Sequence, residues 1–112
     1  VWKSAIELVT EIYKLTHLFP EEEKYSLTSQ MRRAAISVAS NIAEGAARRT
    51  KKEFIQYLHM AQGSISELDT QLEIARRLQY VAGDKVFSVD GLMEKTDKML
   101  SGLIKHQQSP HS

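Results

Sequence analysis

Three polar side chains that could take part in chemistry share one face of a segment rich in Ala, Ile and Val. Ser37, Asn41 and Glu44 are spaced at i, i+4 and i+7, and residues at this spacing lie on the same side of a helix. Ser64 and Glu67 form a second polar pair further along the chain. Burying an amide without a partner costs about 2–7 kcal/mol. We therefore expect these five residues to form a polar network between two helices.

We expect two antiparallel helices joined by a turn near residue 49. Counting residues outward from that turn places the two groups of polar residues at similar heights along the helical hairpin. Ser64 then lies near Ser37, Glu67 lies at the level of Arg33, which could pair with it, and Glu44 could instead reach another helix. Buried polar side chains often fix helix register and order, and we favour this structural role. A binding pocket is the alternative.

The residue spacings give little support for a metal site or for nucleophilic catalysis. A di-iron bundle needs a Glu-x-x-His motif on two of its helices, and no Glu here is followed by His three residues later. The four histidines, which we expect to be exposed, lie away from both serines in this register: His17, His59, His106 and His111. We expect no metal, no cofactor and no enzymatic activity.

Length and composition indicate one small domain. The chain has 112 residues and no Cys, so disulfides and thiolate metal sites are excluded, which suits a reducing cytoplasm. No segment approaches the roughly 20 apolar residues that span a bilayer. We therefore expect a cytoplasmic protein with no membrane contact.

Positive charge is concentrated in the middle of the chain. The net charge is −2 over residues 1–24, +4 over 25–64 and −1 over 65–112. Six cations carry it, and they are the predicted nucleic-acid-binding residues: Arg32, Arg33, Arg48, Arg49, Lys51 and Lys52. No aromatic residue interleaves Arg48–Lys52, so we expect contacts to the phosphate backbone of RNA or DNA rather than base stacking. Ordinary solvated helix ends are the other interpretation.

Hydrophobic periodicity predicts an all-α fold, an antiparallel up-down four-helix bundle over residues 1–106 with a polar tail at 107–112. The helices are expected at 2–18, 27–47, 51–81 and 88–106. In the first helix, the expected core face includes Trp2, Ala5, Ile6, Val9, Ile12, Tyr13 and Thr16, and Leu8 and Leu15 widen it.

Local signals set the helix boundaries. Pro20 disfavours helix in the residue before it, and Thr50 with Glu53 forms a capping box at the third helix. Ala82-Gly83-Asp84 is expected to close that helix. Gly45, inside the second helix, predicts either close approach of a neighbouring helix or a helix end. Phe19 and Tyr25 are expected to fold back onto the core.

Five segments carry a resemblance to a known family: Phe19-Pro20, Glu23–Gln30, Ser37–Gly45, Glu53–Leu58 and Gly63–Leu68. They resemble the four-helix bundles encoded in intervening sequences of bacterial 23S ribosomal RNA genes. The most specific features are the Asn-Ile-Ala-Glu-Gly core ending at Gly45 and the Gly-Ser-x-x-Glu-Leu motif beginning at Gly63.

This resemblance implies an antiparallel bundle that assembles as a ring-shaped homopentamer. It also implies similarity to the accessory protein of diversity-generating retroelements, a basic bundle that works with a reverse transcriptase and nucleic acid. It assigns no catalytic residue. The sequence thus favours a non-enzymatic oligomer associated with nucleic acid through the turn between the second and third helices. A protein-interaction scaffold with no nucleic-acid role is the alternative.

Overall fold

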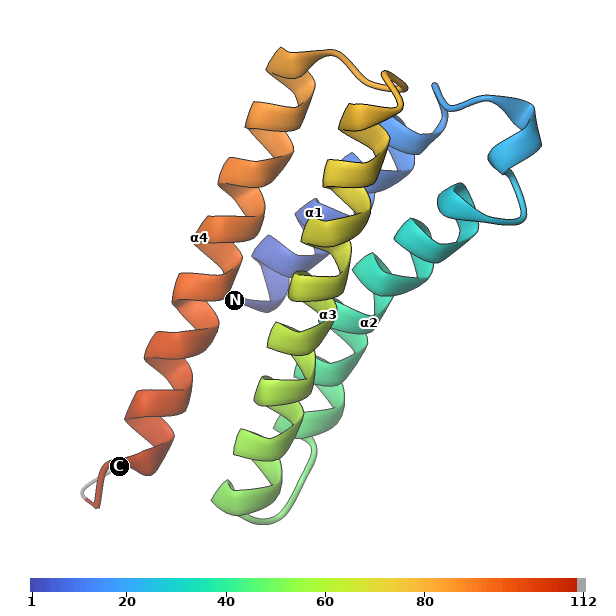
Figure 1. Ribbon diagram of the computed structural model, residues 1–112. Coiled ribbons are helices and arrows are strands. Elements are labelled where there is room, and N and C mark those ends of the chain that lie inside the picture. Colours follow the sequence, from blue (N-terminus) through green and yellow to red (C-terminus); the bar gives the residue numbers. More distant parts are fainter. Residues whose placement is uncertain (111–112) are drawn as a thin grey trace.

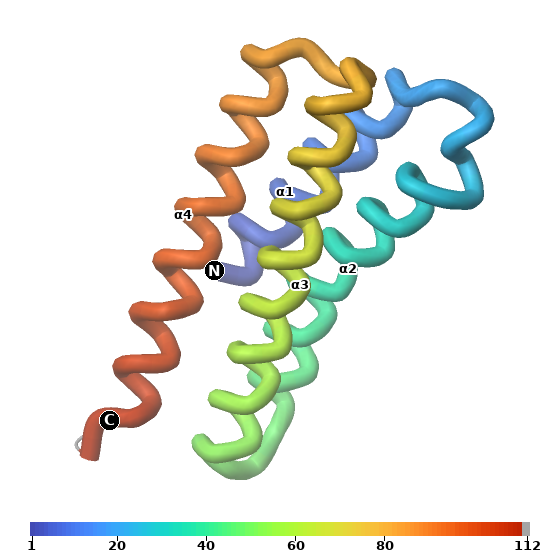
Figure 2. Tube along the Cα trace, viewed as in Figure 1, coloured from blue at the N-terminus to red at the C-terminus, as the bar shows by residue number. Residues whose placement is uncertain are grey.

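Four α-helices form an antiparallel bundle in the computed structural model, which describes residues 1–110 (Figure 1). They are α1 (Trp2–Thr16), α2 (Leu27–Ala46), α3 (Lys51–Arg77) and α4 (Gly83–Gln108), with a short 3-10 helix, η1 (Glu21–Glu23), between α1 and α2. Each helix packs on its neighbours in the order α1–α2–α3–α4, and α4 packs back on α1. The trace in Figure 2 shows the up-down path directly. The predicted all-α four-helix bundle is confirmed.

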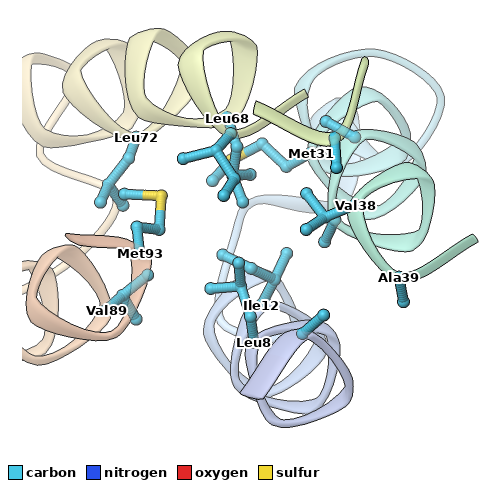
Figure 3. Packing of buried hydrophobic residues seen from close by; sticks show 14 of the residues in the cluster. Leu8, Ile12, Met31, Val38, Ala39, Leu68, Leu72, Val89 and Met93 are labelled. Carbon is cyan, nitrogen blue, oxygen red and sulfur yellow. The ribbon is translucent and has the colours of Figure 1, made fainter. Parts of the chain in front are cut away.

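Apolar side chains from all four helices meet along the axis of the bundle. In Figure 3, Leu8 and Ile12 of α1 face Val38 of α2, Leu68 of α3 and Met93 of α4. A buried hydrogen bond crosses this interior, because the hydroxyls of Ser4 and Thr96 lie 2.6 Å apart and join α1 to α4. Each hydroxyl therefore has a polar partner, as burial requires.

The inward face of α1 is narrower than the expected one. Leu8 and Leu15 are buried as expected, whereas Trp2, Ile6 and Tyr13 are exposed. Two overlapping apolar stripes run along α1, and only one of them meets α2 and α4. The outer stripe therefore remains on the surface.

The end of α3 also differs from expectation. The helix ends at Arg77, four residues early, because Gln79 adopts a left-handed conformation with φ 62°. The amide of Tyr80 donates to Ala75 O and that of Gln79 donates to Arg76 O, both at 3.0 Å. This pair of bonds is the Schellman motif, so the helix closes before Ala82-Gly83-Asp84.

That early closure frees residues for α4, which begins at Gly83 instead of 88. The amides of Lys85 and Val86 both donate to Ala82 O at 3.1 Å, and Asp84 in the first turn suits the positive end of the helix dipole. At the other end, Gln107 and Gln108 of the expected tail are helical. His111 and Ser112, the end of that tail, lie outside the described residues.

The two aromatic residues of the α1–α2 connection behave differently. Phe19 is buried and its ring lies 5.5 Å from that of Tyr80. Tyr25, expected to cover the core, is 89% exposed. The prediction for Tyr25 is wrong, and Leu27, two residues later, is buried at the start of α2 instead.

Candidate nucleic-acid interface

A chain of hydrogen bonds links three of the five predicted network residues. Asn41 Nδ2 donates to Ser37 O at 2.9 Å and to Ser37 Oγ at 3.0 Å, and the two serine hydroxyls lie 2.8 Å apart. Ser64 Oγ also donates to Met60 O at 3.2 Å. A hydroxyl has one proton to donate, so Ser37 donates to Ser64. The chain crosses from α2 to α3 at a half-buried position and helps to fix their register.

The two carboxylates lie outside this chain. Glu44 forms an ion pair with Arg48 one turn on, and its side chain is 57% exposed. Glu67 is exposed and accepts from Gln71 Nε2 at 3.2 Å, and no Arg33–Glu67 pair forms within residues 1–110. The expectation that both carboxylates join an interior network is wrong, because their longer side chains reach past the α2–α3 contact to water.

Gln71 is a buried polar residue that the spacing argument left outside the network. It is 6% exposed, and its Oε1 has no hydrogen-bond partner within the described chain. Its position one helical turn after Glu67 is the feature of the sequence that could have placed it in the network. A buried amide oxygen is normally hydrogen-bonded to protein or to ordered water.

The predicted basic turn is exposed and well defined. Ala47–Thr50 joins α2 to α3, and Arg48, Arg49, Lys51 and Lys52 are all exposed. The capping box is present: Glu53 N donates to Thr50 Oγ1 at 3.1 Å, and Thr50 Oγ1 donates to Glu53 Oε1 at 3.0 Å. Arg48 also lies over the ring of Tyr57 at 4.8 Å. Four cations are therefore held at one tip of the bundle.

Arg32 and Arg33 do not belong to that tip. They lie near the start of α2, about 24 Å from Arg48 at 1.5 Å per residue. Arg32 Nε donates to the buried Thr16 Oγ1 at 2.9 Å, and its guanidinium lies 4.4 Å from the ring centroid of Tyr13. The six predicted cations thus form two separate basic surfaces. Sequence reasoning missed Tyr13 and Thr16 as the partners that orient Arg32.

An acidic groove lies between α3 and α4. It has a volume of about 250 Å³ and is lined by Asp69, Asp90, Glu94 and Asp97, together with Ser66. Partial burial and the neighbouring Asp69 raise the pKa of Asp90. Within residues 1–110, no group of three potential ligands is placed to hold a metal ion. This groove is therefore an acidic surface, separate from the two basic surfaces.

In the described chain, no hydrogen bond joins Ser37 or Ser64 to a histidine. The hydroxyls of Ser37 and Ser64 bond to each other, to Asn41 and to Met60 O. His17 follows α1, His59 lies on α3 and His106 lies on α4, all exposed. His111 lies outside the described residues. In the described chain, none of the helices is long and apolar enough to cross a bilayer.

Comparison with known proteins places this geometry in a family. The model of the 23S rRNA-intervening sequence protein family matches residues 1–102. The chain belongs to this family. The intervening-sequence family was the one indicated by the Asn-Ile-Ala-Glu-Gly and Gly-Ser-x-x-Glu-Leu motifs, so that resemblance is confirmed. Among curated proteins no match was found.

A solved structure shares the bundle of this intervening-sequence protein. It is the crystal structure of a protein of unknown function from the S23 ribosomal protein family of Bacteroides thetaiotaomicron, with a TM-score of 0.86 and 23% identity. The alignment covers 93% of this chain and 97% of that one. At this identity the likeness concerns the fold alone.

Proposed function

We propose that this protein is a non-enzymatic, self-associating bundle that binds the phosphate backbone of nucleic acid through its α2–α3 turn. The observation that carries the proposal is the group of four exposed cations on a turn held by a capping box. A rigid cationic tip neutralises phosphates with little loss of conformational freedom, and this contact is independent of base sequence.

The surroundings of the tip favour an anionic partner. The acids nearest in sequence, Glu44 and Glu53, are engaged by Arg48 and by Thr50. The last turn of α4, with Lys105 and His106, reaches the same end of the bundle (Figure 1). The acidic groove faces a different part of the surface, between α3 and α4. The charge distribution therefore supports an anionic partner at the tip, and we propose nucleic acid.

A stripe of exposed residues on α3 supports self-association. Met60, Ile74 and Leu78 are 48%, 44% and 50% exposed, and their spacing places them on one side of the helix. The exposed Gly63 and Glu67 lie on the same side between Met60 and Ile74, and Leu78 is the C-cap residue of α3. We propose that a second copy covers this stripe in a homo-oligomer, a ring-shaped pentamer as the family resemblance implies, working in the cytoplasm.

The backbone contact is tested by charge reversal at the tip. Arg49→Glu with Lys52→Glu leaves the Arg48–Glu44 ion pair intact. We expect affinity for a 20-bp duplex at low salt to fall at least tenfold. The slope of log K against log salt should decrease in magnitude by about 2, since each lost phosphate contact removes about 0.9.

The matched control reverses two cations of α4 distant from the tip, Lys85→Glu and Lys95→Glu. It changes the net charge equally and should change affinity less than about threefold. Equal losses in both double variants would show a net-charge effect and contradict a site at the turn. Unchanged binding in the tip variant would also overturn the proposal and leave the protein-interaction scaffold as the better function.

A further inference from the structure

We propose that a second site, between the end of α1 and the start of α2, binds a single-stranded segment of nucleic acid by base stacking. Tyr25 is the stacking surface, Tyr13 supports the guanidinium of Arg32, and Lys24, Arg32 and Arg33 contact the phosphates. The inference rests on the proposed association with nucleic acid, but it concerns a different surface and a different contact from those of the α2–α3 turn.

The groove itself is the first observation. It has a volume of about 430 Å³, within the range of ligand sites. Both tyrosines, the three cations and Ile36 line it. Exposed aromatic faces beside a cationic track are the combination that single-strand binding proteins use.

The exposure of the Tyr25 ring is the second observation. Tyr25 is 89% exposed, and Lys24 Nζ lies 5.6 Å from the centroid of its ring. An aromatic ring this exposed contributes little to the core and leaves most of its surface free. It precedes α2 directly, in the turn after η1, so the chain presents a stacking surface at the mouth of the groove.

Arg32 is oriented before any ligand binds. Its Nε donates to Thr16 Oγ1, a buried hydroxyl, and its guanidinium lies over Tyr13. Neither Arg32 nor Arg33 forms an ion pair within residues 1–110. The terminal nitrogens of Arg32 therefore remain available for a phosphate, and the planar fork of arginine suits this contact.

The lining of the groove is positive, since it includes Lys24, Arg32 and Arg33 and no carboxylate. The three glutamates of η1 lie just before Lys24 in the chain; Glu21 lies 3.9 Å from Lys24 Nζ, and Glu23 accepts hydrogen bonds from Ser26 and Tyr80. The positive lining favours an anionic ligand over a neutral apolar one.

Single strands fit this groove better than duplexes do. In a duplex the bases stack on one another, so their faces cannot reach Tyr25. In a single strand the bases can be splayed out and stacked on aromatic rings. The groove therefore recognises the bases of a single strand, whereas the α2–α3 turn binds through phosphates alone.

The test uses the intact chain with three probes: a 12-nucleotide oligouridine, an abasic strand of the same length and a 20-bp duplex. Tyr25→Ala should lower affinity for oligouridine about tenfold, roughly 1.4 kcal/mol, within the range for stacking of one base. Affinity for the abasic strand and the duplex should change less than about twofold. Tyr25→Phe should retain binding because the ring remains.

Phe87→Ala is the matched control, since Phe87 is also an exposed aromatic residue but lies on α4. Equal effects of Tyr25→Ala and Phe87→Ala, or an equal loss on the abasic strand, would overturn the stacking site. A changed mass in light scattering with unchanged affinity would also overturn it, by showing that a second copy covers the groove.

The two proposed binding sites can be tested independently of each other. Arg33→Glu should weaken oligouridine binding and reduce its salt slope by about 0.7, whereas Arg49→Glu with Lys52→Glu should act mainly on the duplex. Loss of single-strand binding in Tyr25→Ala with no effect of the tip variant would support the groove and contradict the turn. The opposite pattern would contradict the groove alone.

Discussion

At the scale of single residues, Gly45 shows most directly how close two helices come. A Cβ at this position would lie 2.8 Å from Tyr57 Cβ, 2.9 Å from Phe54 Cδ1 and 3.3 Å from Phe54 O. Of the two explanations that the sequence left open, close approach of the neighbouring helix is confirmed. Only a residue without a side chain allows α2 and α3 to meet at this distance.

Gly45→Ala should therefore destabilise the protein. Overpacking of this kind costs about 1–3 kcal/mol, which exceeds the gain of about 0.5–1 kcal/mol from replacing a helical glycine. Urea unfolding should show a lower midpoint with an unchanged slope.

Gly91→Ala provides the control, because a Cβ there meets nothing within 4 Å. It should stabilise the protein by about 0.5–1 kcal/mol. Equal stabilisation by both alanines would contradict the close approach at Gly45.

At the scale of elements, the two connections at one end of the bundle are joined to each other. Tyr80, after α3, donates its hydroxyl proton to Glu23 Oε2 of η1 at 2.7 Å. Hydrogen bonds from Ser26 and then Tyr80 lower the pKa of Glu23, and the bond to Glu23 raises the pKa of Tyr80. Phe19 packs on the same tyrosine ring. The turn after α1 thus contacts the turn before α4.

Tyr80→Phe should keep the ring contact with Phe19 and remove the bond to Glu23. We expect the melting temperature at pH 7 to fall by a few degrees. A lowered carboxyl pKa stabilises the folded state above its unfolded value, and this contribution disappears as pH falls through the folded pKa. The difference between Tyr80→Phe and the parent should therefore shrink below about pH 4.5, the ordinary pKa of Glu23.

At alkaline pH, the contribution of Tyr80 to stability has the opposite pH dependence. The raised pKa of Tyr80 stabilises the fold below about pH 10, its ordinary value, and this contribution is lost as pH rises through the folded pKa. Melting curves across pH would check both limits. Tyr57→Phe is the control, since the Tyr57 hydroxyl has no hydrogen bond within the described chain. A pH-independent difference for Tyr80→Phe would contradict the link.

At the scale of the whole molecule, different surfaces have different chemistry. The tip of α2–α3 and the α1–α2 groove are cationic, the α3–α4 groove is acidic, and α3 carries an exposed apolar stripe. The exposed apolar side chains of α3 are the surface of the proposed contact between copies.

Ile74→Asp with Leu78→Asp should disrupt that assembly. Placing carboxylates in an apolar interface requires their desolvation, so light scattering should show the mass falling from a multiple of 12.7 kDa toward one chain. Leu18→Asp, at an equally exposed leucine outside α3, should leave the mass unchanged. A parent mass retained by the α3 variant would remove the proposed interface.

The sequence predicted much of the local structure. Thr50 and Glu53 act within one helical turn, and Pro20 restricts its own neighbour, so the boundaries near these residues were predicted to within two residues. The end of α3 was missed because Gln79 adopts the left-handed conformation usually supplied by Gly. No local signal in the sequence marked that position.

The sequence by itself determined the number, order and approximate limits of the helices, because hydrophobic periodicity and capping act over short stretches of chain. Only the tertiary structure decided which apolar stripe of α1 is buried, that Glu44 and Tyr25 face solvent, and that the predicted cations separate into two surfaces. These properties depend on the neighbouring helix at each position. Periodicity defines the faces of a helix but not the partner that each face meets.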